Sequence, residues 1–300
     1  MTTEFKQAIM DLFDKLKRNA LHLAYQPAET PVAVGQSKIG GQPDVPGDFV
    51  WPYYEGKDWD EVIANRPLTF MAQINLAEAA ALDKDGLLPK QGLLSFFYEM
   101  ATEKWGFDPE DKGCAKVYYF ADAAGLAQRD FPEDLDEEYR LPEFAVSMKA
   151  LTDLPDYFDF RHKPETQGVP EQYPEDVSKF GWNQYEKLRA EYGCKPPEDG
   201  WSETTKLLGY PNVIQNPMEF ECEKVSRGLY DGRPDEISEE LTAEIEAASQ
   251  DWILLFQMGT VEEGDFELMF GDVGHIYYWI RKQDLATGNF DNVWLILQCS

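Results

Sequence analysis

The sequence predicts an α+β fold built from two pseudo-repeated, mainly antiparallel β units, with an N-terminal helix and inserted helices. Three observations predict it: a nine-residue motif occurs twice, short apolar runs follow both copies in the same order, and amphipathic segments precede and interrupt these runs. The chain has 300 residues, 43% of them hydrophobic, so it can bury a large core without disulfides or metals. We expect a single compact domain over residues 1–300.

The start of the chain, residues 1–17, predicts an amphipathic helix. Charged side chains alternate there with apolar ones such as Phe5, Ile9 and Phe13 at helical spacing. The same mixture of charges does not fit a signal peptide, which needs an apolar central region. We place the first repeat after this helix, over residues 20–125.

The repeated motif reads SKIGGQPDV at residues 37–45 and TKLLGYPNV at residues 205–213. An internal match of this kind indicates a duplicated unit. Glycine suits a backbone that turns sharply or adopts a positive φ, and proline fixes the direction in which the chain leaves the turn. We therefore assign structural roles to the glycines and prolines that both copies share, which are Gly41, Pro43, Gly209 and Pro211.

Three kinds of run follow each copy in the same order: an apolar run with one glutamine, a glycine-led aromatic run and a β-rich run. They are short, rich in aromatic and β-branched residues, and bounded by Gly, Pro and Asp, which favours strands over helices. The three pairs occupy residues 68–74 and 253–258, 92–98 and 274–280, and 117–120 and 293–297. Asp272 and Gly274 introduce the second aromatic run, and we interpret them as a hairpin turn, with a lone catalytic acid at Asp272 as the alternative.

Residues 126–200 predict an acidic, proline-rich surface connection with one helix. Eight of the nineteen prolines and eighteen acidic residues fall in residues 130–200. Within them, apolar residues recur at near-helical intervals and Gly193 follows as a stop, so we expect a helix over about 176–192. The second repeat, residues 201–300, contains a further predicted helix, marked by the four-, four- and three-residue spacing of Ile237, Leu241, Ile245 and Ala248.

The formal charge is −29, from 27 basic and 56 acidic residues. Nucleic-acid binding relies on Lys and Arg to displace counterions from phosphates, so we expect no nucleic-acid partner. We also expect no membrane association, because no apolar stretch approaches the roughly 18 residues of a membrane span. The four cysteines lie far apart and form no CxxC pair, which favours reduced thiols in the cytoplasm over two disulfides.

The sequence contains no catalytic signature, and we favour a protein without enzymatic activity. The HExxH, GxSxG and P-loop motifs are absent, and Gly40-Gly41 lacks the other glycines of a dinucleotide fingerprint. The three histidines are more than a hundred residues apart, and the acidic run 130–138 lacks the ligand pattern of an EF-hand. We therefore predict no metal site and no cofactor.

Five residues from the repeated or flanking motifs are candidates for ligand binding: Lys38, Trp51, Gln73, Lys206 and Gln257. The two lysines either lie along an apolar surface with their ammonium groups in water, or form an anion site or an ion pair between the halves. The two glutamines either tie a strand to the neighbouring turn, contact a ligand, or face solvent.

Several ordered motifs resemble the YwqG-like family, whose function is not established. In the first half they are SKIGGQPDVP followed by Trp51-Pro52, then LTFMAQINLAE and LLPKQGLLSFFY. In the second half they are DWILLFQM, FGDVGHIYYWI, Asp284-Leu285 and FDNVWLILQCS. One departure is Phe270, where a Trp is expected. The resemblance covers about residue 20 to the C-terminus and implies an α+β protein, largely bacterial and intracellular, sometimes encoded near polymorphic toxin systems; it implies no reaction and no catalytic residues.

Two functions from different classes remain open on the sequence. The first is a binding protein that recognises a basic protein partner, because an acidic surface accelerates encounter with a basic one. A link to toxins comes only from the family resemblance. The second is a small-molecule or sugar-binding protein, or an unrecognised enzyme, with its site in the cleft between the repeats.

Overall fold

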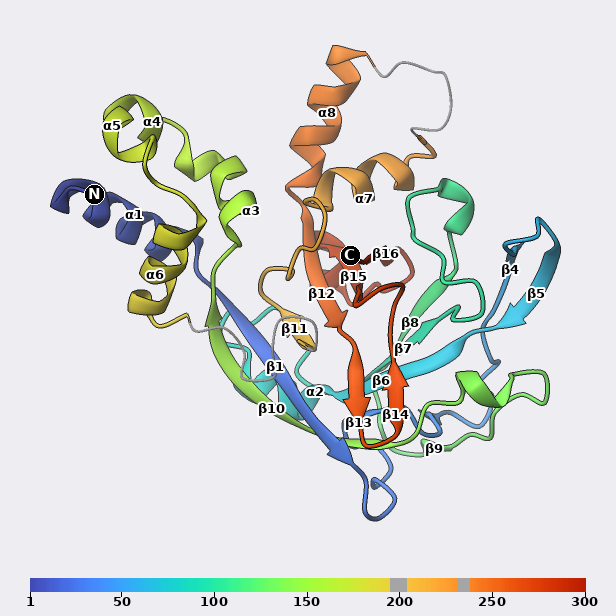
Figure 1. Ribbon diagram of the computed structural model, residues 1–300. Helices are drawn as coiled ribbons and strands as arrows, with labels where there is room; N and C mark the ends of the chain where they lie inside the picture. The colour runs from blue at the N-terminus through green and yellow to red at the C-terminus, as the bar shows by residue number, and fades with distance from the viewer. Residues whose placement is uncertain (195–203, 231–237) are drawn as a thin grey trace.

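The computed structural model describes residues 1–194, 204–230 and 238–300 (Figure 1). It confirms an α+β fold with an N-terminal helix and a large antiparallel sheet. The described strands form a ten-stranded sheet, in the order β16 (Trp294–Gln298), β15 (His275–Arg281), β12 (Trp252–Met258), β11 (Lys206–Leu208), β1 (Arg18–Pro27), β10 (Phe144–Asp153), β2 (Lys38–Ile39), β6 (Thr69–Asn75), β7 (Leu93–Tyr98) and β8 (Ala115–Phe120).

The centre of this sheet is the long antiparallel ladder of β1 and β10, in which Arg18 pairs with Asp153 and Pro27 with Phe144. On the β1 side follow β11, β12, β15 and β16, and on the β10 side follow β2, β6, β7 and β8. We call these four-strand groups the C-terminal arm and the N-terminal arm. The strands predicted from the paired apolar runs thus occupy matching places in the two arms.

The two arms pack against each other through aromatic side chains. The rings of Phe96 in β7 and Phe256 in β12 have centroids 4.5 Å apart. The hydroxyl of Tyr278 in β15 donates to the carbonyl oxygen of Phe97 at 3.2 Å, and the backbone N–H of Leu297 donates to the carbonyl oxygen of Trp105 at 3.0 Å. The space between the arms is therefore filled core and holds no open cleft at these contacts.

Short paired strands and helices surround the sheet. The pairs are β3 (Asp44–Val45) with β9 (Ala127–Gln128), β4 (Tyr53–Lys57) with β5 (Ile63–Pro67), and β13 (Val261–Glu263) with β14 (Phe266–Leu268). The helices are α1 (Thr3–Leu16), α2 (Leu76–Leu82), α3 (Tyr157–His162), α4 (Val169–Gln172), α5 (Pro174–Val177), α6 (Trp182–Tyr192), α7 (Glu219–Ser226), α8 (Glu239–Ser249) and α9 (Lys282–Thr287), with 3-10 turns at Pro109–Asp111, Glu137–Tyr139 and Pro164–Thr166.

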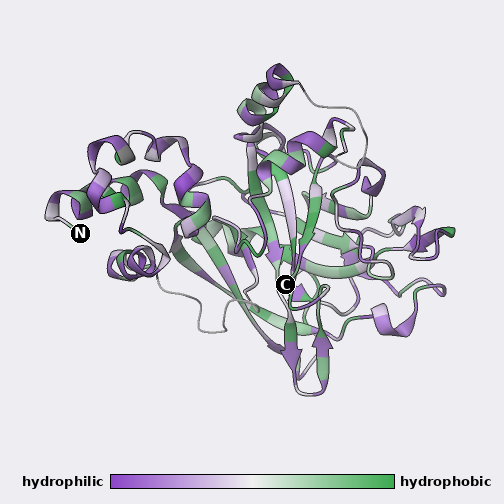
Figure 2. Cartoon of the chain, turned by 45° about the horizontal axis from the view of Figure 1, so that its top comes forward, coloured by the Kyte–Doolittle hydropathy of each residue, from purple (hydrophilic) through white to green (hydrophobic). Residues whose placement is uncertain are grey.

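The predicted N-terminal helix is confirmed as α1, which begins where the Thr2 hydroxyl accepts the Phe5 N–H. Its apolar face packs on α3 and α6 in a second core, where the rings of Phe13 and Tyr185 lie 5.4 Å apart. Figure 2 shows hydrophilic and hydrophobic residues interleaved along these helices, as an amphipathic helix on a core requires. This helical cluster lies at one end of the β1–β10 ladder (Figure 1).

The helix expected over about 176–192 begins later than predicted. Residues 174–177 form the separate short helix α5, and α6 starts after Gly181, whose extended backbone interrupts the helical path. The stop at Gly193 is confirmed, because this glycine adopts a left-handed φ of 102°. The other inserted helix is confirmed as α8, although Ile237 lies outside the described residues.

Residues 126–200 were expected to be a surface connection, and this expectation is wrong for residues 144–153. They form β10, a central strand of the sheet that pairs with the whole of β1. The acidic run 130–138 does remain on the surface, with all six of its carboxylate side chains exposed. In the described parts of the chain, no helix combines the length and apolar composition needed to cross a membrane.

Candidate functional site

A cavity of about 790 Å³ lies between helices α3 and α6 on one side and strands β1, β10 and β11 on the other. The second copy of the repeated motif forms part of its wall through Lys206 in β11 and Asn212 in the following turn. Tyr157 and Phe158 of α3 and Trp182 of α6 supply aromatic rings. The cavity therefore joins the helical cluster to the end of the β1–β10 ladder.

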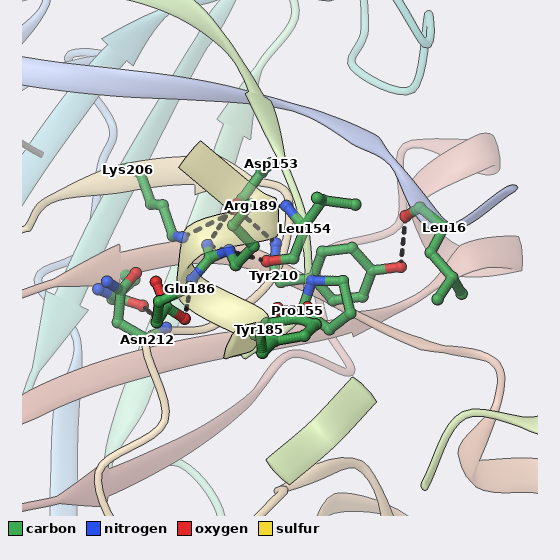
Figure 3. Close-up of polar contacts among 11 residues, drawn as sticks. Leu16, Asp153, Leu154, Pro155, Tyr185, Glu186, Arg189, Lys206, Tyr210 and Asn212 are labelled. Atoms are coloured by element: carbon green, nitrogen blue, oxygen red, sulfur yellow. Dashed lines mark hydrogen bonds and ion pairs between the residues drawn. The ribbon is translucent and has the colours of Figure 1, made fainter. Parts of the chain in front are cut away.

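Asp153, the last residue of β10, organises the charged wall of this cavity (Figure 3). Its Oδ2 atom lies 3.0 Å from the Nζ atom of Lys206 and accepts the Tyr210 N–H at 2.9 Å. Its Oδ1 atom lies 3.8 Å from a terminal nitrogen of Arg189. This carboxylate lies between the two cations because it ends β10 close to Arg189 of α6. Lys206 comes from β11, which pairs with the other side of β1.

Arg189 projects from α6 and is held by several groups. One terminal nitrogen lies 3.2 Å from Glu186 Oε1, and the other donates to the carbonyl oxygen of Leu154 at 3.2 Å. Burial by itself would lower the pKa of Arg189, but the carboxylates of Asp153 and Glu186 raise it. Its Nε atom has no hydrogen-bond partner among the described residues. This guanidinium is fixed in place and still has one buried donor to offer.

Lys206 is mostly buried, and burial lowers the pKa of its ammonium group despite the attraction of Asp153. Asp153 is the one carboxylate among the described residues that forms an ion pair with it. An ammonium group carries three N–H donors, so Lys206 can donate a hydrogen bond to a further oxygen besides Asp153.

Asn212 is only 5% exposed. Its backbone N–H donates to Gln257 Oε1 at 2.8 Å, and its backbone carbonyl accepts the Tyr277 hydroxyl at 2.6 Å. Its side-chain Oδ1 atom has no hydrogen-bond partner among the described residues. A buried acceptor without a partner costs about 1–3 kcal/mol, so this oxygen favours any molecule that brings a donor into the cavity.

The remaining wall is aromatic or only weakly reactive. Phe158 is 62% exposed and Trp182 is 56% exposed, which leaves two large rings at the mouth of the cavity. Burial raises the pKa of the Cys194 thiol to about 11, so this side chain stays protonated near neutral pH. Across the described ranges, no three His, Cys, Asp or Glu side chains are grouped so that they could hold a metal ion. These features suit reversible binding of a molecule with apolar and polar parts.

The structure brings the five candidate residues together only in pairs. Lys38 lies opposite Gln73 across β2 and β6, and Lys206 lies opposite Gln257 across β11 and β12. Of the five, Lys206 alone lines the cavity. Trp51 lies elsewhere, against the hydrophobic core shared by the two arms, where its Nε1 donates to the Leu68 carbonyl at 2.9 Å.

Lys38 is completely buried, so its ammonium group does not extend into water. Its Nζ lies 3.1 Å from Glu143 Oε2 and 3.5 Å from Asp44 Oδ1. This is the ion-pair alternative, although the partner Glu143 lies in the segment expected to be a connection. A Cβ atom on Gly41 would approach Glu143 Oε2 to 2.7 Å, so only glycine leaves this ion pair room.

The two glutamines are buried and tie a strand to the repeated motif. Gln73 Oε1 accepts the Asp44 N–H at 3.0 Å, and its Nε2 donates to the Gln36 carbonyl at 2.8 Å. Gln257 repeats both contacts at the equivalent motif positions, with the Asn212 N–H and the Thr204 carbonyl, each at 2.8 Å. Both side chains are fully buried, so neither amide group is accessible to a ligand in this structure.

The shared glycines have the expected backbone, but the turn at Asp272 is not a hairpin, because it joins β14, which pairs with β13, to β15, which pairs with β12 and β16. Both Gly41 and Gly209 adopt a positive φ, of 67° and 76°. Asp272 lies in a turn, and a Cβ atom on Gly274 would approach the Phe270 carbonyl oxygen to 2.1 Å, so a side chain there would collide with the backbone.

Sequence reasoning missed Asp153, Arg189, Asn212 and the two exposed rings. Asp153 and Arg189 lie outside the repeated motif, and no local pattern connects them with Lys206. Asn212 could have been found, because it replaces the Asp44 of the first copy within an otherwise similar motif.

Comparison with known proteins gives a family and no activity. No curated protein matches the chain. The family described as "Domain of unknown function (DUF1963)" matches residues 37–299, from the first residue of the first motif to the penultimate residue. The match contains both motif copies and most of the cavity wall. The chain therefore belongs to the DUF1963 family.

Proposed function

We propose that this protein binds a small molecule in the cavity between α3, α6, β10 and β11. The observation that carries this proposal is the cavity itself. Its volume of about 790 Å³ falls within the roughly 300–1,000 Å³ typical of small-molecule sites. Its wall combines aromatic rings with a few convergent polar groups, which is how such sites obtain both affinity and orientation.

The proposed site differs in place from the one expected between the repeats. Aromatic core fills the contact between the arms, where Phe96 and Phe256 meet. The cavity instead uses the second motif copy together with α6 from the segment 126–200. A sugar or another metabolite with a polar and an apolar face would suit this wall, since exposed aromatic rings cover apolar faces well.

A thermal-shift screen against a metabolite library tests the proposal, because a molecule that binds only the folded state raises its melting temperature. Ala190→Trp places a large ring in the cavity wall, and Ala243→Trp makes the same change on the exposed surface of α8. We expect active compounds to stabilise the wild type and Ala243→Trp but not Ala190→Trp. Compounds that stabilise all three proteins equally, or a library without any active compound, would overturn the proposal.

A second candidate function is recognition of a basic protein, and the net charge of −29 favours it. Unpaired negative charge of this size steers basic partners toward the surface and keeps the free protein soluble. The exposed carboxylates of residues 130–138 offer one such surface. We propose, from sequence resemblance, that the chain is of the YwqG-like type and that its partner is toxin-linked. The four free, buried cysteines support a cytoplasmic setting.

Affinity capture from the source cell at rising salt tests this second function. We expect one basic protein to be retained at about 0.15 M salt and released at about 0.5 M, since added salt screens surface charges. The identified protein should then bind in purified form, and more weakly to a variant with Asp130, Glu133 and Asp134 changed to their amides. An affinity that changes neither with the salt concentration nor with these substitutions would argue against charge-driven recognition.

A further inference from the structure

The two motif copies hold their lysines in different charge environments. Lys38 lies within 4 Å of two carboxylates, those of Glu143 and Asp44. Among the described residues Lys206 forms an ion pair with one carboxylate, that of Asp153, and Arg189 shares it at 3.8 Å. The second copy is therefore one carboxylate short of the first.

The missing carboxylate can be traced to one position of the motif. Asp44 and Asn212 occupy equivalent places, since the backbone N–H of each donates to the glutamine of the adjacent strand. Asp44 Oδ2 accepts hydrogen bonds from the Gly35 N–H at 2.8 Å and from Gln73 Nε2 at 2.5 Å. The corresponding oxygen of Asn212 is buried and has no partner among the described residues, and Asn212 is one of the residues that line the cavity. The carboxylate of the first copy has its hydrogen-bond partners, whereas the second copy leaves a buried side-chain oxygen without one.

The charges on the cavity wall also favour a negatively charged ligand. Among its described residues, three are basic (Lys187, Arg189 and Lys206) and three are acidic (Asp153, Asp156 and Glu186), so their formal charges cancel. The chain as a whole carries 56 acidic against 27 basic residues. The cavity wall is thus far less negative than the rest of the protein, and an anion approaching it meets less repulsion there than at the average surface.

We propose that the cavity binds a small organic acid, whose carboxylate pairs with Lys206 and supplies there the negative charge that Asp44 supplies beside Lys38. The Nε–H of Arg189 is a second donor for this carboxylate. A hydroxyl or amino group of the same ligand donates to Asn212 Oδ1, and an apolar or ring portion covers Phe158 and Trp182. This inference rests on the proposed function and adds the chemical class of the ligand: a small hydroxy- or amino-carboxylate with an apolar part.

Matched acids and amides test the ligand class by calorimetric titration of the full chain. The probes are 4-hydroxybenzoate, 4-hydroxyphenylacetate and L-tyrosine, each compared with its primary amide, which keeps the shape and removes the negative charge. We expect at least one acid to bind the wild type about tenfold or more tightly than its amide. Equal affinity of every acid and its amide, or binding of none of the three acids, overturns the inference, and neither result depends on a variant.

Asn212→Asp restores the carboxylate that the second copy lacks, and Asp44→Asn removes the corresponding one from the first copy. We expect Asn212→Asp to raise the melting temperature of the ligand-free protein and to weaken acid binding about tenfold or more. Asp44→Asn should lower the melting temperature and leave acid affinity unchanged. If Asn212→Asp binds the acids as the wild type does, the ligand carboxylate does not pair with Lys206 and the inference is wrong.

The failure of this inference and the failure of the proposed function give different results. Neutral or cationic library compounds that stabilise the wild type, but not Ala190→Trp, would support small-molecule binding and overturn the organic-acid class. Absence of any compound that depends on Ala190 would overturn both.

Discussion

Lys38 and Lys206 occupy the same position of the repeated motif, and both ammonium groups are removed from most of the solvent. A buried ammonium group persists only when carboxylates and hydrogen bonds compensate for lost hydration. Glu143 and Asp44 do this for Lys38, whereas Asp153 is shared between Lys206 and Arg189. The charge of the first lysine is therefore compensated by two carboxylates, whereas the second lysine shares its carboxylate with Arg189.

We expect Lys38→Met to lower the free energy of unfolding by about 3 kcal/mol or more, because it leaves the buried Asp44 carboxylate without its cation. Lys206→Met should cost less, because Asp153 keeps Arg189 as a partner. Lys149→Met, at an exposed position of β10, is the control and should cost under about 0.5 kcal/mol. Urea unfolding of the three variants measures the order, and equal losses for Lys38→Met and Lys149→Met would contradict it.

Cys194 provides a prediction about reactivity. Burial raises its thiol pKa from 9.0 to about 11, which lowers the thiolate fraction at neutral pH about a hundredfold. The thiolate is the reactive species, so a disulfide reagent at pH 7.5 should modify Cys194 in the folded protein at least about a hundredfold more slowly than in urea. Mass spectrometry of the modified peptide follows both rates. Similar rates in the two conditions would show that the cavity does not shield this thiol.

At the level of single residues, the sequence identified positions that a repeated motif marks and missed those that only the fold brings together. Gln73 and Gln257 could be selected because each is the one polar amide in an apolar run. Hydrogen bonding of each glutamine to the neighbouring turn was one of the alternatives that the sequence allowed. Asp153 and Arg189 belong to segments that share no local pattern with Lys206. Their convergence depends on long-range pairing of β10 with β1, which periodicity does not report.

Among the elements, β10 is the one that changes the interpretation most. Its segment lies between acidic and proline-rich stretches, and Phe144 is its one fully buried residue, so its alternation is weak. It is a strand because β1, more than a hundred residues earlier in the chain, supplies a complete partner. The amphipathic helix α1, in contrast, could be predicted because its spacing is a local property of the sequence.

The β1–β10 ladder should be among the last parts of the molecule to open. Backbone amides in a central ladder exchange with solvent only through large-scale unfolding, whereas exposed turns exchange by local fluctuation. Hydrogen–deuterium exchange read by mass spectrometry should therefore show slow exchange for residues 144–153, comparable to that of β6 and β12. Residues 121–130, which are largely exposed, serve as the rapidly exchanging reference. Fast exchange across 144–153 would mean that this segment behaves as the connection expected from composition.

For the whole molecule, the order of the sheet bears on the predicted duplication. The strands β1, β2, β6, β7 and β8 precede, in chain order, a second series of β10, β11, β12, β15 and β16. The first strand of each series pairs with the second strand of the other, so that β1 lies beside β11 and β10 beside β2. These correspondences support a duplicated unit whose leading strands are exchanged, and the duplication stays a prediction.

An exchange of leading strands has a consequence for stability. The innermost strand of each arm pairs with a strand from the other half of the chain, β11 with β1 and β2 with β10. The aromatic core between the arms contains residues of both. We therefore expect residues 1–300 to unfold as one cooperative unit, with coincident urea transitions in tryptophan fluorescence and far-ultraviolet circular dichroism. Phe96→Ala, which removes a ring packed against Phe256 of the opposite arm, should cost about 3–5 kcal/mol and move both transitions together. Two separate transitions, or a shift of only one, would mean that the arms fold independently and that the β1–β10 ladder does not couple them.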